Sequence, residues 1–341
     1  MSSKEQDDEV EKKDRVQLSI PDKFLLSLGL QNDHREEETM RRREAKWYKL
    51  TGETPGTSIE SFTQSFSEKR RKHNVTSQIS GTNDRSWPNW EKSVKKNASA
   101  LKRRIRKGIP SHFRGEVWFR MSGAKTLMDN NKGEYQRLTG LKSKWEKKIG
   151  VDLNRSFPHD PLFEEGAKGQ DMMGRVLRAY SCKDEEIGYC QGMNFVSGVL
   201  LMEMEEEKAF WTLYAMLNNK VRAFQITTKI FDFQLFFFSR QKYDLRGLYK
   251  NLMRKTKQIL YSMDKMYERL LPRLKRHLDD MHLDINYFAT EWIMTLFSNC
   301  LHLNVVRIIW DAFFNEGWKI IKTGAATQFM EFWMIGLSFT F

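Results

Sequence analysis

The chain has 341 residues, 40% of them hydrophobic and 13% aromatic, so it is long enough to bury a sizeable core. Seven prolines in a sequence rich in Met, Leu, Phe, Lys and Glu favour a mostly helical protein. The three cysteines, Cys182, Cys190 and Cys300, are irregularly spaced, which argues against a disulfide framework and against a zinc site. We therefore expect a protein of a reducing compartment.

The net charge of +13 is concentrated in one region, because residues 1–40 carry −5 and residues 41–110 carry +12. The first fifteen residues are charged and contain no apolar core, so no signal peptide is predicted. The apolar stretch 325–341 is at the lower length limit of a membrane span and contains Glu331, which favours a buried terminal helix or a non-native tail over an anchor. These features predict a cytoplasmic protein.

The first 97 residues form a charged, low-complexity region in this interpretation. Stretches such as "TGETPGTSIESFTQSFSEK" are rich in Ser, Thr and Gly and show little apolar periodicity, which predicts a largely disordered region. Two short helices are expected to interrupt it, over residues 22–30 and 37–51. From Ala98 onward, apolar residues recur at intervals of three and four, which predicts one all-α domain over residues 98–341.

Several kinds of site are missing from the sequence. It contains no GxxxxGK[ST] phosphate loop, no GxGxxG turn, no HExxH motif and no GxSxG motif. The seven histidines are scattered, and His277 and His282 are five residues apart, which does not place them on one helical face. We therefore predict neither a cofactor nor a metal bound by this chain itself.

The first of three short motifs lies in "KGIPSHFRGEVWFRMSGA", residues 107–124. Pro110 and Ser111 are residues that begin helices, and Arg114 and Trp118, four residues apart, share a helical face. By itself the pattern is typical of a helix start with an arginine packed over an indole.

The second motif lies in "KKIGVDLNRSFPHDP", residues 147–161. Ile149, Asp152 and Arg155 follow one another at intervals of three, and Pro158 ends any helix. One interpretation is an apolar anchor beside a surface ion pair. The other is an arginine that Asp152 holds at the end of a segment and directs outward.

The third motif is "GYCQGMN", residues 188–194, between two expected helices. Gly188 and Gly192 permit a tight turn or a close backbone approach. Gln191 is then expected at the start of the second helix, where its side chain can project from the turn. The alternative is that Gln191 or Asn194 caps this helix.

Together, the patterns R-x-x-x-W, I-x-x-D-x-x-R and Y-x-Q-G-M, in this order, resemble the signature motifs of the TBC domain, a family of Rab GTPase-activating proteins. The resemblance covers about residues 105–322 and implies a single multi-helix domain. The sequence after about residue 323 does not resemble the family's continuation, so the domain is expected to be atypical or truncated there.

The resemblance implies that Arg155 and Gln191 act in trans on a GTP-bound Rab GTPase, with Arg155 at the phosphates and Gln191 placing the attacking water. The Rab would hold GTP and Mg²⁺, so this chain is expected to be an activator without substrate turnover of its own. Supporting roles are implied for Asp152, which orients Arg155, for the scaffold residues Arg114, Trp118 and Ile149, and for the loop residues Tyr189, Gly192 and Met193.

Two alternatives remain. A non-catalytic Rab-binding scaffold would share the fold, although this chain keeps both finger residues. A basic nucleic-acid-binding protein is suggested by "KRRIRKGIP" and "EKRRKHN", but the aromatic–basic interleaving of a nucleic-acid groove is missing, so no nucleic acid is predicted as a partner. The implied process is vesicle trafficking, with peripheral association with endomembranes through the Rab or the basic region 41–110.

Overall fold

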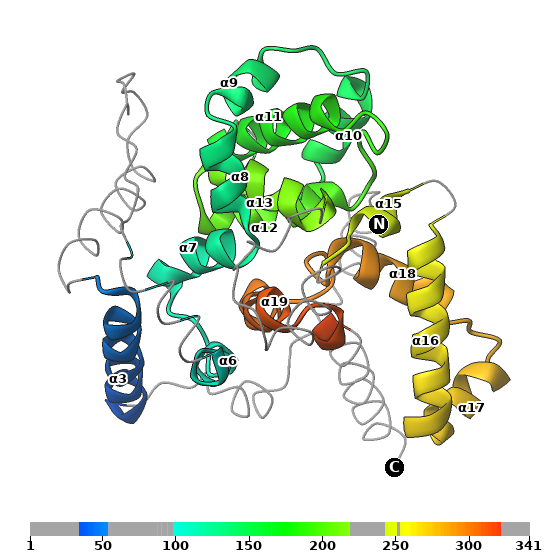
Figure 1. The fold of residues 1–341 in the computed structure, drawn as a ribbon. Coiled ribbons are helices and arrows are strands. Elements are labelled where there is room, and N and C mark those ends of the chain that lie inside the picture. Colours follow the sequence, from blue (N-terminus) through cyan, green and yellow to red (C-terminus); the bar gives the residue numbers. More distant parts are fainter. Residues whose placement is uncertain are drawn as a thin grey trace, which may run out of the picture. The chain divides into compact units, whose positions relative to one another are not determined.

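The computed structural model describes residues 34–53, 87, 90, 94, 98–164, 166–218, 243–250 and 253–321. The chain divides into two compact units, residues 1–91 and 92–341, and each is described by itself. In these described stretches every regular element is a helix, so the predicted all-α fold is confirmed (Figure 1).

The described part of the first unit contains α3, His34–Thr51. This is the helix predicted for residues 37–51, and it begins three residues earlier. Trp47 and Leu50 are buried, three positions apart on one face. The helix ends where Thr51 Oγ1 donates to the carbonyl of Trp47 at 3.1 Å and Gly52 takes a positive φ of 78°. The helix predicted for residues 22–30, and most of the region predicted to be disordered, lie outside the described residues.

The described helices of the second unit fall into three runs along the chain. The first run is α6 (Ala98–Arg106), α7 (Ser111–Met121), α8 (Ala124–Asn130) and α9 (Glu134–Thr139). The second is α10 (Glu146–Leu153), α11 (Lys168–Lys183), α12 (Met193–Glu203) and α13 (Glu206–Asn218). The third is α15 (Arg246–Tyr249), α16 (Arg254–Leu270), α17 (Pro272–Asp280), α18 (Asn286–Thr295) and α19 (Leu303–Glu316). The predicted end of the domain, after about residue 323, lies outside the described residues.

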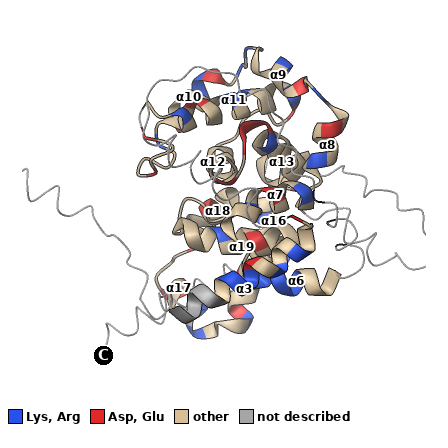
Figure 2. Cartoon of the chain, turned by 90° about the vertical axis from the view of Figure 1, so that its left-hand side faces the viewer, with Lys and Arg blue, Asp and Glu red and all other residues tan. Residues whose placement is uncertain are grey.

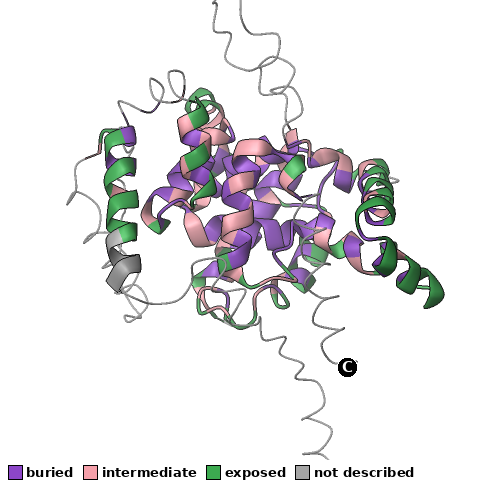
Figure 3. Cartoon of the chain, turned by 90° about the horizontal axis from the view of Figure 1, so that it is seen from below, coloured by how far each residue is buried: buried purple, intermediate pink, exposed green. Residues whose placement is uncertain are grey.

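Helix α12 lies at the centre of the second unit. Its sequence "MNFVSGVLLME" is apolar on every side, which is typical of a fully buried helix, and residues 193–201 are all buried. It packs against α7, α10, α11, α13 and α18. The buried residues of the second unit accordingly gather around α12, while the outer faces of the surrounding helices are exposed (Figure 3). Because Gln191 lies two residues before the start of α12, the core of the unit holds the third motif in place.

Charged residues lie mainly on the surrounding helices (Figure 2). Helix α6 buries Leu101 and Ile105 on one face and presents basic residues on the other. Two of these, Lys102 and Arg106, bind Glu316 at the end of α19, with Arg106 Nε 2.6 Å from Glu316 Oε1. Helix α10 likewise buries Ile149 and Asp152 against the core and turns its other face outward.

Candidate functional site

The second motif lies at the end of α10. Ile149 is buried and anchors the helix, and Asp152 is 5% exposed in the last turn. Arg155 follows the helix, with its side chain half exposed. The Nε of Arg155 donates to Asp152 Oδ1 at 2.9 Å, and Nη2 lies 2.6 Å from the same oxygen. The carboxylate therefore holds one edge of the guanidinium against the protein, and the donors on its other side remain available.

The same carboxylate also binds the third motif. The buried hydroxyl of Tyr189 donates to Asp152 Oδ2 at 2.5 Å. Burial, and next this bond to Asp152, raise the pKa of the Tyr189 hydroxyl well above its usual value, so it stays protonated and acts as the donor. Asp152 thus uses one oxygen for Arg155 and the other for Tyr189, which brings the second and third motifs together.

A second connection runs through Asn194, which is fully buried. Its Nδ2 donates to Ser156 Oγ at 2.7 Å, and its Oδ1 accepts from the backbone N–H of Gly192 at 2.9 Å. Ser156 Oγ in turn donates to the carbonyl of Asp152 at 2.5 Å. The turn after Arg155 and the turn after Gln191 are therefore joined by side chains as well as by packing. The sequence indicates Asn194 only as a helix cap, and it does not single out Ser156.

Internal packing accounts for both glycines of the third motif. Gly188 has a φ of +61°, and a Cβ there would lie 2.0 Å from Trp145 Nε1. Gly192 has a φ of +102°, and a Cβ there would lie 2.9 Å from the carbonyl oxygen of Met294 in α18. Both positions combine a left-handed backbone with a close contact, which only glycine satisfies without strain. Approach by another protein is not needed to explain either residue.

Gln191 lies at the surface between these two glycines. It is exposed, and across the described residues its side-chain amide makes no hydrogen bond. The residues on either side are held from within: the backbone N–H of Cys190 lies 3.3 Å from Met193 Sδ, and Met193 is fully buried. The result is an exposed amide without a hydrogen bond, on a fixed backbone two residues after the tyrosine that shares Asp152 with Arg155.

The charged turn that leads to Gln191 is fixed by two helices. Asp184 is buried at the end of α11, where the Tyr180 hydroxyl donates to its Oδ2 at 2.9 Å. Arg246 of α15 binds the same Asp184 oxygen and also donates to Glu186 Oε2 at 2.5 Å. The backbone N–H of Gly188 donates to the Asp184 carbonyl at 2.7 Å. These bonds restrict the path of the chain into the third motif.

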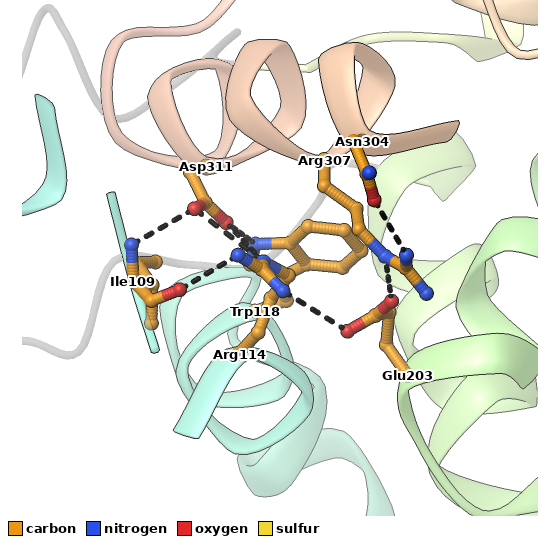
Figure 4. Close-up of polar contacts among 7 residues, drawn as sticks. All are labelled: Ile109, Arg114, Trp118, Glu203, Asn304, Arg307 and Asp311. Carbon is orange, nitrogen blue, oxygen red and sulfur yellow. Dashed lines mark hydrogen bonds and ion pairs between the residues drawn. The ribbon is translucent and has the colours of Figure 1, made fainter. Parts of the chain in front are cut away.

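The first motif forms a different cluster, centred on Asp311 of α19 (Figure 4). Asp311 is fully buried and accepts from Trp118 Nε1 at 2.8 Å and from Arg114 Nε at 3.1 Å. Its other oxygen accepts from the backbone N–H of Ile109 at 3.0 Å. Burial raises the pKa of the Asp311 carboxyl to about 6, an effect opposed by Arg114 and by the N–H donors. Arg114 and Trp118 therefore meet through a shared carboxylate, which the motif spacing does not indicate.

The Asp311 cluster continues to the C-terminal end of α12. Glu203 lies 3.6 Å from Arg114 Nη1 and accepts from Arg307 Nε at 2.5 Å, and Arg307 also binds Asn304 (Figure 4). Gln191 precedes the opposite end of this eleven-residue helix, about 16 Å away at 1.5 Å per residue. The first motif thus joins α7, α12 and α19 at a distance from Arg155 and Gln191.

Within the part of the chain that the structure describes, no group of three or more His, Cys, Asp or Glu side chains could hold a metal ion. A search of the same residues finds no helix that is both long and apolar enough to cross a membrane.

A family model described as the Rab-GTPase-TBC domain matches residues 111–237 and 223–334. The chain belongs to the Rab-GTPase-TBC domain family. All three motifs lie inside the matched range. Their predicted catalytic and supporting positions there include Arg114, Trp118, Ile149, Asp152, Arg155, Tyr189 and Gln191. The predicted family membership is confirmed.

Named relatives and a solved structure agree with this family. The chain is 32% identical over 234 residues to the Rab GTPase-activating protein eat-17 of Caenorhabditis elegans. The aligned residues make up 68% of this chain and 23% of the relative. The chain is also 30% identical over 280 residues to the Drosophila melanogaster ecotropic viral integration site 5 ortholog. Here the aligned residues make up 78% of this chain and 32% of the relative. The chain therefore spans about a quarter to a third of these relatives.

The fold of this TBC domain also matches a crystal structure. The Chlamydomonas flagellar RabGAP TBC domain is similar with a TM-score of 0.54 and 27% sequence identity, covering 78% of this chain and 81% of that one. The arrangement of the described helices is therefore that of a TBC domain.

Proposed function

We propose that this chain is a GTPase-activating protein for a Rab-family GTPase in its GTP-bound state, and that it supplies Arg155 and Gln191 in trans. The observation that supports the proposal best is the position of Asp152, whose two oxygens bind Arg155 and Tyr189. These bonds join the turn that carries the half-exposed Arg155 guanidinium to the turn that carries the exposed Gln191 amide.

Arg155 suits the electrostatic part of GTP hydrolysis. Phosphoryl transfer depends mostly on positioning and on stabilising the charge that develops on the phosphate oxygens, so a partner protein can supply a missing cation. A guanidinium stays charged at all working pH values and offers paired donors to phosphate oxygens. The bond to Asp152 leaves the far side of the Arg155 side chain free to bind them.

Gln191 suits the positioning part. Its amide has one acceptor and two donors, so it can accept a bond from the attacking water while donating to the GTPase. A neutral amide needs no tuned pKa, so this role requires no acid–base pair. The GTPase would hold the nucleotide and Mg²⁺, and this chain would turn over no substrate of its own.

The proposed domain comprises residues 98–341. The proposed process is the control of vesicle trafficking on endomembranes, where the GTP-bound Rab or the basic region 41–110 would recruit the protein. A non-catalytic Rab-binding scaffold is the second candidate. The exposed Gln191 amide and the half-exposed Arg155 guanidinium argue against it, because a scaffold that only binds the Rab needs no catalytic side chain at the surface.

Single-turnover GTP hydrolysis across a panel of GTP-loaded Rab proteins tests the proposal. On a Rab that the unaltered chain activates, we expect Arg155→Ala to lower the stimulated rate by on the order of 10³ or more, because the arginine stabilises the transition state. We expect Gln191→Ala to lower it sharply as well. The Gln191 side chain is exposed, so Gln191→Ala should barely change the melting temperature. Arg155→Ala should lower it, because the buried Asp152 carboxylate loses its cation, so the rates are compared per folded molecule.

Binding without acceleration by the unaltered chain would support the scaffold instead. A variant that keeps near-full stimulation would remove its residue from the proposed mechanism.

A further inference from the structure

The outer face of α10 continues from Arg155 along the helix. Lys147, Lys148, Val151 and Asn154 are exposed, and with Arg155 they occupy positions i, i+1, i+4, i+7 and i+8. Residues at these intervals lie on one side of an α-helix, and Asn154 still has helical dihedral angles of −65° and −23°. We call these five residues the α10 face.

An apolar side chain lies in the middle of the α10 face. Val151 is 68% exposed, which makes it one of the most exposed large hydrophobic residues that the structure describes. Single exposed apolar residues are common on protein surfaces and by themselves indicate nothing. Here the surrounding charges make the position informative.

The α10 face is positively charged because the nearby carboxylates are already bound. Glu146 accepts from Arg178 Nη1 at 2.6 Å, and Asp152 is buried against Arg155. Among the described residues neither Lys147 nor Lys148 has a carboxylate partner, and Lys148 Nζ lies 4.8 Å from the centre of the Trp145 ring. Two lysines without a carboxylate partner therefore lie one turn before Val151, and Arg155 lies one turn after it.

The α10 face is also continuous with the third motif. The Trp145 ring under Lys148 is the ring against which Gly188 packs. Lys148 is close enough to Cys190, the residue before Gln191, to oppose the rise in thiol pKa that burial causes there. The two lysines, Val151, Arg155 and Gln191 therefore belong to one surface.

We propose that the α10 face is the surface on which the GTPase docks, an inference that rests on the proposed function. The partner presents acidic side chains to Lys147 and Lys148 and an apolar side chain to Val151. Lys148 and Arg155 are seven residues apart, about 10 Å along the helix, so these contacts fall on the rim of the nucleotide pocket that Arg155 enters. Charge complementarity of this kind speeds association and discriminates between partners.

The test uses the full chain carrying Lys147→Glu and Lys148→Glu, and a GTPase that the unaltered chain activates. In single-turnover hydrolysis at increasing activator concentration, we expect the half-saturating concentration to rise by about tenfold or more, because attraction at the rim becomes repulsion. We expect the rate at saturation to stay within about twofold, since Arg155 and Gln191 are unchanged. Val151→Asp should also raise the half-saturating concentration.

The matched control is Arg254→Glu with Lys257→Glu, which changes the net charge equally on exposed positions of α16. Helices α10 and α16 are well apart in Figure 1. The control should leave both the half-saturating concentration and the saturated rate unchanged. Equal effects of the two charge reversals would show a general charge effect and would overturn the proposal.

Other outcomes also decide the question. An unchanged half-saturating concentration with normal stimulation would disprove the docking face while the proposed function stands. If the reversal abolishes binding to vesicles containing phosphatidylserine but leaves hydrolysis kinetics unchanged, the face contacts membranes and the proposal is wrong.

If the unaltered chain binds Rab proteins without accelerating hydrolysis, the same variants are compared by equilibrium binding. If it binds none, the function and the docking face both fail.

Discussion

Asp152 is the residue on which the geometry of the site depends. Its side chain is buried, and its two oxygens accept from a guanidinium on one side and a tyrosine hydroxyl on the other. A buried carboxylate is stable only when such partners surround it. The two motifs that carry Arg155 and Gln191 therefore depend on one another through this side chain, although they lie thirty-six residues apart in the sequence.

We expect Asp152→Asn to lower the stimulated hydrolysis rate by about 10²-fold, because displacing a positioned group by about 1 Å costs that much. The amide keeps the shape of the carboxylate but loses its charge and one of its two acceptors. Single-turnover hydrolysis measures the effect. Tyr189→Phe is the companion variant: it leaves Arg155 bound to Asp152, so its loss of rate should be smaller. Full stimulation by Asp152→Asn would contradict the positioning role.

At the scale of elements, the path of the chain into α12 decides where Gln191 lies. The turn before it is bound by Tyr180 and Arg246, and the turn at Gly192 rests on the carbonyl of Met294 in α18. The start of α12 is therefore set by contacts with α11, α15 and α18, and not by the local sequence alone.

Gly192→Ala tests this dependence. The backbone would have to move, because φ is +102° and the added Cβ would lie 2.9 Å from the carbonyl oxygen of Met294. We expect the free energy of unfolding to fall by about 1 kcal/mol or more, because a β-carbon is strained in this conformation. We also expect most of the stimulated hydrolysis to be lost.

Gly150→Ala is the matched control, because this glycine lies in α10 with nothing within 4 Å of the added Cβ. There alanine should be neutral or stabilise the helix by up to about 1 kcal/mol. Denaturant unfolding and single-turnover hydrolysis, measured on both variants, compare the two sites. Equal behaviour of the two variants would show that the turn at Gly192 does not position Gln191.

For the second unit as a whole, the Asp311 cluster connects the first helices to the last. Asp311 of α19 binds Arg114 and Trp118 of α7, and Glu203 at the end of α12 binds Arg114 and Arg307. The contacts of Asp311 with α7 join segments that are 193 and 197 residues apart. The cluster lies at the end of α12 away from Gln191, so its expected effect is on stability.

We expect Asp311→Ala to lower the free energy of unfolding by about 3–5 kcal/mol, because it leaves the Arg114 charge without its buried partner. Thermal denaturation and urea unfolding measure the loss. Stimulation per folded molecule should remain close to that of the unaltered chain, since Arg155 and Gln191 lie elsewhere. A variant of normal stability with reduced stimulation would place the first motif in the catalytic machinery instead.

Much of the fold could be predicted from the sequence. The all-helical architecture, the helix over residues 37–51 and the family itself follow from patterns within short stretches, because helix periodicity and motif spacing are local properties. The pairing of Asp152 with Arg155 is also local, since residues three apart on a helix are neighbours. The sequence by itself determined these features.

Only the tertiary structure decided which distant residues complete each motif. The bond from Tyr189 to Asp152, the link from Asn194 to Ser156 and the role of Asp311 join residues that no local pattern relates. A lone Asp in the apolar stretch "VVRIIWDAFF" was the one visible sign that a buried partner was needed. Such partners are set by how helices pack, and packing brings together side chains whose separation in the sequence carries no periodic signal.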